Sequence, residues 1–182
     1  MTPKTKSRLT LLAVVALFAT PMLVAFWLNA EGWRPHTTRN SGTLIDPPRD
    51  VSAVPVMLAD GSALVWRDPQ WQWSLLALPG TRCAERCRER LDEVLRMRLT
   101  LGRNAGRLRI VYLGPALPAE LVAARAPLIA GTDTGDAFAA YHAQGEDVLA
   151  LALVDPNGKL MMRYAQGYAA LGVRDDLQRV FH

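Results

Sequence analysis

The longest apolar segment of the chain lies near its N-terminus, over residues 9–28. Its sequence, LTLLAVVALFATPMLVAFWL, contains no charged residue. A helix of this length rises about 30 Å, which is the hydrocarbon thickness of a bilayer. We therefore predict one transmembrane helix over 9–28. A cleaved signal peptide is the alternative, but its apolar core would be shorter, and Leu28-Asn29-Ala30 is a poor cleavage site.

The residues that flank this segment predict its orientation. Lys4, Lys6 and Arg8 precede it, and the aromatic residues Phe26 and Trp27 stand near its other end. Basic residues mark the cytoplasmic flank of a membrane helix, and aromatic residues gather at the bilayer interface. We expect residues 1–8 in the cytoplasm, the helix in the cell inner membrane, and the remainder of the chain in the periplasm.

After the helix, residues 29–50 are polar and contain the pair Pro47-Pro48, so we predict an extended linker there. Short apolar runs then alternate with segments of helical periodicity over one domain, residues 51–182. The runs predict strands over 62–67, 73–78, 108–113, 148–154 and 159–164, and the periodic segments predict helices over 83–98, 119–125, 134–143 and 173–181.

The order of these elements indicates the fold class. Alternating strands and helices predict an α/β domain with a mixed sheet flanked by helices. Asp155-Pro156-Asn157-Gly158 is a strong turn signal, so we expect the last two strands to form a hairpin. A closing hairpin followed by a helix is typical of a thioredoxin-like fold.

Charge and motifs mainly exclude functions. The formal net charge is +4, from 21 Lys and Arg against 17 Asp and Glu, and Lys4, Lys6 and Arg8 supply three of those cations before the apolar segment. The rest of the chain is close to neutral, whereas a nucleic-acid-binding domain would keep its basic charge on the folded part, so we expect no nucleic-acid partner. The sequence has no GxxxxGK[ST], GxSxG or HExxH motif to support nucleotide or hydrolase chemistry.

The two cysteines of the chain, Cys83 and Cys87, follow a predicted strand and a Pro-Gly turn and open a predicted helix. A helix N-terminus favours a thiolate, and Arg82 and Arg86 add positive charge. The spacing places both sulfurs on one helix face, where they could share a metal ion or form a disulfide. Thr81 is the expected helix cap. Simple core packing and a purely structural disulfide remain as alternatives.

The chain resembles the Sco/SenC family of copper chaperones and thiol-disulfide proteins, which help assemble cytochrome c oxidase. The resemblance rests on the N-terminal apolar helix, on the Cys83-Ala84-Glu85-Arg86-Cys87 motif between a strand and a helix, and on the closing hairpin and helix around Asp155. It implies a membrane-anchored, thioredoxin-like domain that acts on an oxidase subunit or assembly factor. The action would be thiol-disulfide exchange, copper(I) handling, or both.

The resemblance also assigns roles to residues. Cys83, nearer the helix start, is expected to be the attacking thiol and Cys87 the resolving one, and both are candidate copper ligands. Sco-like proteins take a third ligand from a histidine just before the strand that leads into the Asp-Pro turn. The corresponding positions here, Glu146 to Val148, contain no histidine, so His142 is the nearest candidate.

Other functions remain open. The domain could be a non-enzymatic scaffold that binds an oxidase subunit through Trp66 and Trp71, with the cysteines in a structural disulfide. It could also be a general extracytoplasmic thiol-disulfide oxidoreductase, although no proline precedes the strand that starts at Val148. The acidic residues of the turns, Asp133, Asp136, Glu146 and Asp147, are interpreted as solvated.

Overall fold

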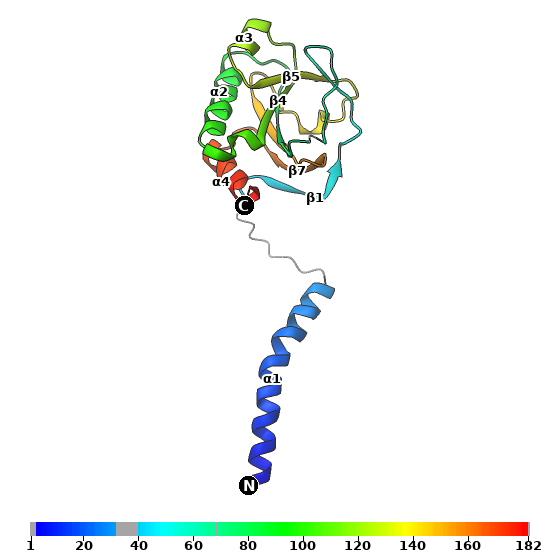
Figure 1. Ribbon diagram of the computed structural model, residues 1–182, viewed down its shortest axis with the longest axis vertical. Coiled ribbons are helices and arrows are strands. Elements are labelled where there is room, and N and C mark those ends of the chain that lie inside the picture. Colours follow the sequence, from blue (N-terminus) through cyan, green and yellow to red (C-terminus); the bar gives the residue numbers. More distant parts are fainter. Residues whose placement is uncertain (1–2, 32–39, 68, 182) are drawn as a thin grey trace. The chain divides into compact units, whose positions relative to one another are not determined.

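The computed structural model describes residues 3–31, 40–67 and 69–181 (Figure 1). The chain divides into two compact units, Met1–Arg39 and Asn40–His182. The described part of the first unit is helix α1 (Pro3–Ala30) with Glu31 after it, so the helix predicted over 9–28 is present. Its transmembrane role is not confirmed, because none of the helices in the described ranges is both long and apolar enough to cross a membrane.

The described part of the second unit is built around a seven-stranded sheet with the strand order β1-β7-β6-β3-β4-β5-β2. The central strands β3, β4 and β5 run parallel, and the remaining pairs are antiparallel, which makes the sheet mixed as predicted. The strands are β1 (Thr43–Asp50), β2 (Val56–Leu58), β3 (Trp73–Pro79), β4 (Leu108–Leu113), β5 (Leu128–Asp133), β6 (Leu149–Val154) and β7 (Lys159–Tyr164). The helices are α2 (Glu85–Leu99), α3 (Ala119–Ala123) and α4 (Ala170–Val180), with short 3-10 turns at Gly102–Arg107 and Ala139–Tyr141.

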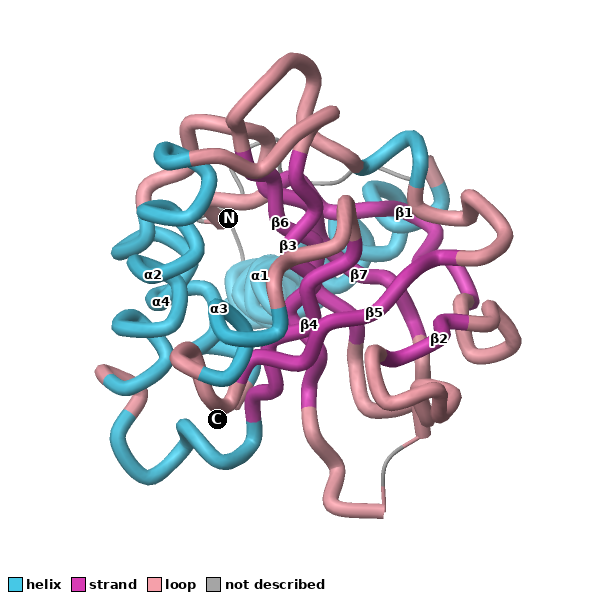
Figure 2. The backbone as a smooth tube through the Cα atoms, turned by 90° about the horizontal axis from the view of Figure 1, so that it is seen from above, coloured by secondary structure: helices cyan, strands magenta, loops and turns pink. Residues whose placement is uncertain are grey.

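The central strands β3, β4 and β6 are buried on both faces, which explains why their sequences are largely apolar. In β3, Leu75 and Ala77 pack under α2 and α4, whereas Leu76 and Leu78 pack against the opposite face. Figure 2 shows α2 and α4 together on one side of the sheet and irregular segments on the other. The predictions for 73–78, 108–113, 148–154 and 159–164 are confirmed as β3, β4, β6 and β7.

The linker prediction is wrong in its second half. Strand β1 pairs antiparallel with β7, so residues from Thr43 onward belong to the sheet. Pro47 and Pro48 are accommodated because β1 lies at the edge of the sheet and its pairing shifts register midway, where a missing N–H leaves no ladder partner unpaired. Part of the predicted linker, residues 32–39, lies outside the described residues.

The strand predicted over 62–67 is also absent from the structure. Only Ala63 forms an isolated bridge, with Met57. This segment is instead a loop that covers the face of the sheet opposite α2 and α4. In it, Trp66 is 3% exposed and its indole N–H donates to the Val54 carbonyl at 2.8 Å. Leu64 and Trp66 are therefore explained by the packing of a loop, whereas Val65 is exposed.

The prediction of a helix over 134–143 is wrong, and strand β5, which precedes this segment, was not predicted. The segment is irregular apart from the short 3-10 turn Ala139–Tyr141. The Asp133 carboxylate accepts the N–H groups of Gly135 at 3.1 Å and Phe138 at 2.8 Å, which turns the chain out of β5. Phe138 is fully buried against the face of the sheet opposite α2 and α4. This apolar residue therefore belongs to a buried loop and not to the face of a helix.

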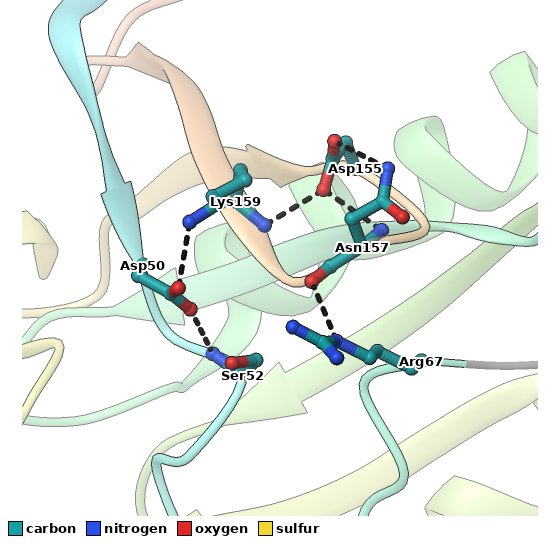
Figure 3. A network of polar contacts seen from close by, with 6 residues as sticks. All are labelled: Asp50, Ser52, Arg67, Asp155, Asn157 and Lys159. Atoms are coloured by element: carbon teal, nitrogen blue, oxygen red, sulfur yellow. Dashed lines mark hydrogen bonds and ion pairs between the residues drawn. The ribbon is translucent and has the colours of Figure 1, made fainter.

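The predicted turn between β6 and β7 is confirmed (Figure 3). One oxygen of Asp155 accepts the backbone N–H of Asn157 at 2.9 Å and that of Lys159 at 2.7 Å. Gly158 has a φ of +81°, and a Cβ there would lie 2.8 Å from the Cβ of Ser52. The turn therefore depends on a carboxylate that is local in sequence and on a glycine that no other residue replaces without strain.

Candidate redox site

Cys83 and Cys87 form a disulfide at the junction between β3 and α2, with their Cα atoms 5.0 Å apart. Cys83 lies just before the helix and is half-buried, whereas Cys87 lies in its first turn and has no exposed surface. The prediction that the pair opens a helix after a strand is confirmed. One partly exposed and one buried cysteine are what a pair needs if one is to meet a client and the other is to resolve the product.

The sheet topology brings a distant segment against this junction. Strand β3 ends where its antiparallel neighbour β6 begins, so the residues before β6 lie beside the residues after β3. The N–H of Gly80 donates to the Val148 carbonyl and that of Thr81 to the Gly145 carbonyl, both at 3.0 Å. A Cβ on Gly80 would lie 1.9 Å from the Gly145 oxygen, so this close contact requires glycine.

Asp147, in this distant segment, caps the cysteine-bearing helix. One carboxylate oxygen accepts the N–H groups of Ala84 at 2.7 Å and Cys87 at 3.0 Å, and the other accepts that of Arg86 at 3.1 Å. Helix α2 has no side-chain cap of its own at Ala84. The prediction that Thr81 caps the helix is wrong, because the Thr81 hydroxyl lies 3.5 Å from the Gly145 carbonyl.

These contacts define the charge beside the disulfide. The N–H of Cys87 is the largest cause that lowers the pKa of Asp147, the other two N–H groups and Arg82 act in the same direction, and burial opposes them. Asp147 is therefore ionised at neutral pH. Arg82 itself pairs with Glu146 at 3.4 Å on the surface, so its charge is partly offset. The interpretation of Asp147 as a solvated turn residue is wrong, because its carboxylate is engaged by three backbone donors.

His142 does not join the cysteines. Its ring Nδ1 lies 2.7 Å from the Pro79 carbonyl, which can only accept, so Nδ1 carries the proton. Among the residues that the structure describes, no three His, Cys, Asp or Glu side chains gather into a group that could hold a metal ion. The predicted ligand set of Cys83, Cys87 and His142 is not assembled in this disulfide form. At the position where the resemblance would place a third ligand, Asp147 caps a helix instead.

Sequence reasoning missed Asp147, although one signal was present. The residues at the helix start, Cys83, Ala84 and Glu85, include none of the preferred caps Ser, Thr, Asp and Asn. An uncapped helix start implies that its donors find a partner elsewhere in the chain. The sequence does not reveal which residue it is, because the partner is 60 or more positions away.

The two tryptophans proposed as a partner surface have different environments. Trp66 is buried and packs against Phe138 with ring centroids 5.8 Å apart, so it cannot contact a partner. Trp71 is 62% exposed. Of the two tryptophans that the scaffold interpretation proposed as a partner surface, Trp71 is therefore the one that a partner could contact.

A mixed sheet with a disulfide between its first central strand and the following helix defines a thioredoxin-like domain. A family profile described as "Transmembrane-like, thioredoxin-like, C-terminal domain" matches residues 73–182. The chain belongs to this family. A comparison with curated proteins finds no match.

Solved structures of Sco proteins share the fold. Apo Sco1 from Thermus thermophilus aligns with a TM-score of 0.55 and 19% identity, over 81% of this chain and 99% of that one. Arabidopsis thaliana ScoI with copper bound aligns with a TM-score of 0.52 and 17% identity, over 68% and 92%. BsSco, described as a member of the Sco family of cytochrome c oxidase assembly proteins with a disulfide switch, aligns with a TM-score of 0.51 and 17% identity, over 74% and 96%. The Sco/SenC resemblance drawn from the sequence is confirmed at the level of the fold.

Proposed function

We propose that this protein is a Sco-like accessory factor for cytochrome c oxidase assembly that reduces disulfides in an oxidase subunit or assembly factor. The observation that carries the proposal is the Cys83–Cys87 disulfide, which joins a half-buried and a fully buried cysteine at the start of α2. The Sco-like fold supports the choice of client, since BsSco is described as belonging to a family of oxidase assembly proteins.

The chemistry is a pair of thiol-disulfide exchanges that starts from the reduced protein. The Cys83 thiolate attacks one sulfur of the client disulfide, which forms a mixed disulfide and releases the other client sulfur as a thiolate. Cys87 then loses its proton and attacks the Cys83 sulfur, which closes the Cys83–Cys87 disulfide and releases the second client thiolate. The client gains two electrons, and this protein loses two.

The reduced pair is regenerated from the disulfide by a second dithiol. A dithiol reductant attacks the Cys83–Cys87 disulfide by the same route, leaves as a disulfide, and returns two electrons and two protons to the cysteines. The half-buried position of Cys83 suits both steps, because one sulfur meets the client and the reductant in turn.

We also propose that residues 9–28 anchor the protein in the inner membrane, with residues 1–8 in the cytoplasm and the domain in the periplasm. The support is the uncharged 9–28 segment behind Lys4, Lys6 and Arg8. A tether would raise the effective concentration of the domain near a membrane-embedded client. Alkaline extraction of membranes tests this part: an anchored protein stays in the pellet, and a peripheral one is released.

The function is tested by deletion and complementation in the source organism. Restoring the wild-type gene should restore cytochrome c oxidase activity, whereas Cys83→Ser and Cys87→Ser should not, although both variants accumulate and fold. Trp71→Ala should complement fully. Full complementation by both cysteine variants, with failure of Trp71→Ala, would instead support the tethered scaffold.

Copper handling is the second candidate function. It is favoured by the two neighbouring sulfurs at the start of α2, since Cu(I) is soft and prefers thiolates, and by the copper-bound state of Arabidopsis thaliana ScoI. A Cu(I) competition titration of the reduced protein tests it, with Cys83→Ser and His142→Ala as comparisons. One tight equivalent that disappears in Cys83→Ser supports this function, and loss in His142→Ala would identify the third ligand. Failure to compete with the chelator would rule it out.

A further inference from the structure

The backbone donors at the start of α2 are already occupied. In a helix N-terminus with free N–H groups, those groups stabilise a nearby thiolate, which favours the reduced form of a cysteine pair. Here Ala84, Arg86 and Cys87 all donate to Asp147 at 2.7–3.1 Å. The donors that would serve a Cys83 thiolate therefore face a carboxylate.

The carboxylate also adds charge. Asp147 carries a full negative charge at the start of α2, beside the residues that follow Cys83, and a thiolate formed on Cys83 would be repelled by it. Arg82 offsets little of this effect, because it is 68% exposed and pairs with Glu146. Loss of donors and like-charge repulsion act in the same direction, since both raise the free energy of the reduced, thiolate-bearing state relative to the disulfide.

We propose that Asp147 is a positioning residue that sets the Cys83–Cys87 pair as a reducing couple, by holding the helix donors away from the Cys83 thiolate. The dithiol form then gives up its electrons readily to a client disulfide. This inference rests on the proposed function for its biological meaning, but the reduction equilibrium of the pair can be measured whether or not that function holds.

The fold provides a matched control at the other end of β6. Asp155 also uses a carboxylate to accept backbone N–H groups, from Asn157 and Lys159, but those donors belong to the β6–β7 turn (Figure 3). The two aspartates flank the same strand, and Asp147 alone contacts the cysteine-bearing helix. Asp155→Asn therefore makes the same chemical change without touching the redox pair.

The experiment equilibrates the full chain with mixtures of reduced and oxidised dithiothreitol at pH 7 and counts free thiols by alkylation and mass. For Asp147→Asn we expect the equilibrium constant for reduction of the protein disulfide to rise about tenfold, which corresponds to about 30 mV. Asp155→Asn should stay within twofold of wild type. An Asp147→Asn constant within twofold of wild type, or an equal rise in Asp155→Asn, would overturn the proposal.

Asp147→Ser provides a second test if Asp147→Asn does not fold, because serine keeps a neutral helix cap. It should show the same direction of change. In the Cys87→Ser background, Asp147→Ser should also make Cys83 react several-fold faster with iodoacetamide at pH 7, because more of it is thiolate. An unchanged or slower reaction would contradict the proposal, whereas failure of the oxidase complementation with a shifted equilibrium would contradict only the proposed function.

Discussion

The two ends of strand β6 use the same chemical group for different tasks. At the N-terminal end, Asp147 binds three backbone N–H groups that are 60 to 63 positions away in the chain. At the C-terminal end, Asp155 binds two N–H groups that are two and four positions away. The first carboxylate joins β6 to the cysteine-bearing helix, and the second closes a turn. An aspartate beside a strand is thus a turn former or a long-range cap, depending on which donors the fold places next to it.

The largest effect should follow from separating the two segments at the Asp147 end. In Gly80→Ala, the new Cβ meets the Gly145 oxygen, which is backbone and cannot rotate away. We expect a loss of about 3 kcal/mol in the free energy of unfolding, as for overpacking that moves backbone. Urea denaturation measures it. Gly106→Ala is the control, because a Cβ there has no neighbour within 4 Å, and wild-type stability in Gly80→Ala would show that the close contact is not needed.

A smaller effect should be the difference in stability between the two single cysteine variants. Cys83→Ser and Cys87→Ser both remove the disulfide, but only Cys87 has no exposed surface, so its hydroxyl is placed in the core. We expect Cys87→Ser to be about 1–2 kcal/mol less stable than Cys83→Ser, because a buried hydroxyl that lacks a partner is costly. Unfolding curves of the two variants under the same conditions decide it. Equal stabilities would mean that the two sulfurs do not differ in burial.

At the Asp155 end, the effect should be local. Gly158→Ala forces an alanine into a φ of +81° and against Ser52, so we expect a loss of about 1–2 kcal/mol. Because this turn does not touch the cysteines, the dithiothreitol equilibrium should not change. A clear change in that equilibrium would show that the two ends of β6 are coupled, and the comparison between them would then fail.

The smallest effect should be the loss, at acid pH, of the stability that the Asp147 carboxylate contributes. The pKa of Asp147 is lowered in the folded protein, so its contribution to stability is present above the ordinary value of 3.8 and is lost as pH falls below it through the folded value. We expect wild type to be more stable than Asp147→Asn at pH 7 and the difference to shrink below pH 3.8. Urea midpoints of both proteins at pH 7 and at acid pH measure this. A difference that grows in acid would contradict the helix-capping role.

The sequence predicted the elements whose signals are local. The runs 73–78 and 108–113 are largely apolar and form central strands, and the Asp155 turn was predicted from its own residues. Strand β1 was missed because Pro47 and Pro48 are typical of linkers, and only its edge position makes them acceptable.

The candidate site was predicted only in part for the same reason. Cys83 and Cys87 are neighbours in the sequence, so their place at a helix start was predicted from spacing, and a disulfide between them was one of the possibilities that the spacing left open. Asp147 could not be assigned to them, because its role depends on the antiparallel pairing of β6 with β3. The position of His142 likewise depends on a long-range contact, with the Pro79 carbonyl.

The central claim is that Cys83 exchanges disulfides with an oxidase-related client. Its most direct test is to trap the mixed disulfide in cells of the source organism that express the full chain with Cys87→Ser, which cannot resolve it. Acid quenching, alkylation and affinity purification under non-reducing conditions should yield a covalent adduct on Cys83 that contains an oxidase subunit or assembly factor, that reductant releases, and that the Cys83→Ser, Cys87→Ser double variant lacks. An adduct equally abundant in the double variant, or none at all from folded Cys87→Ser protein, would contradict the account.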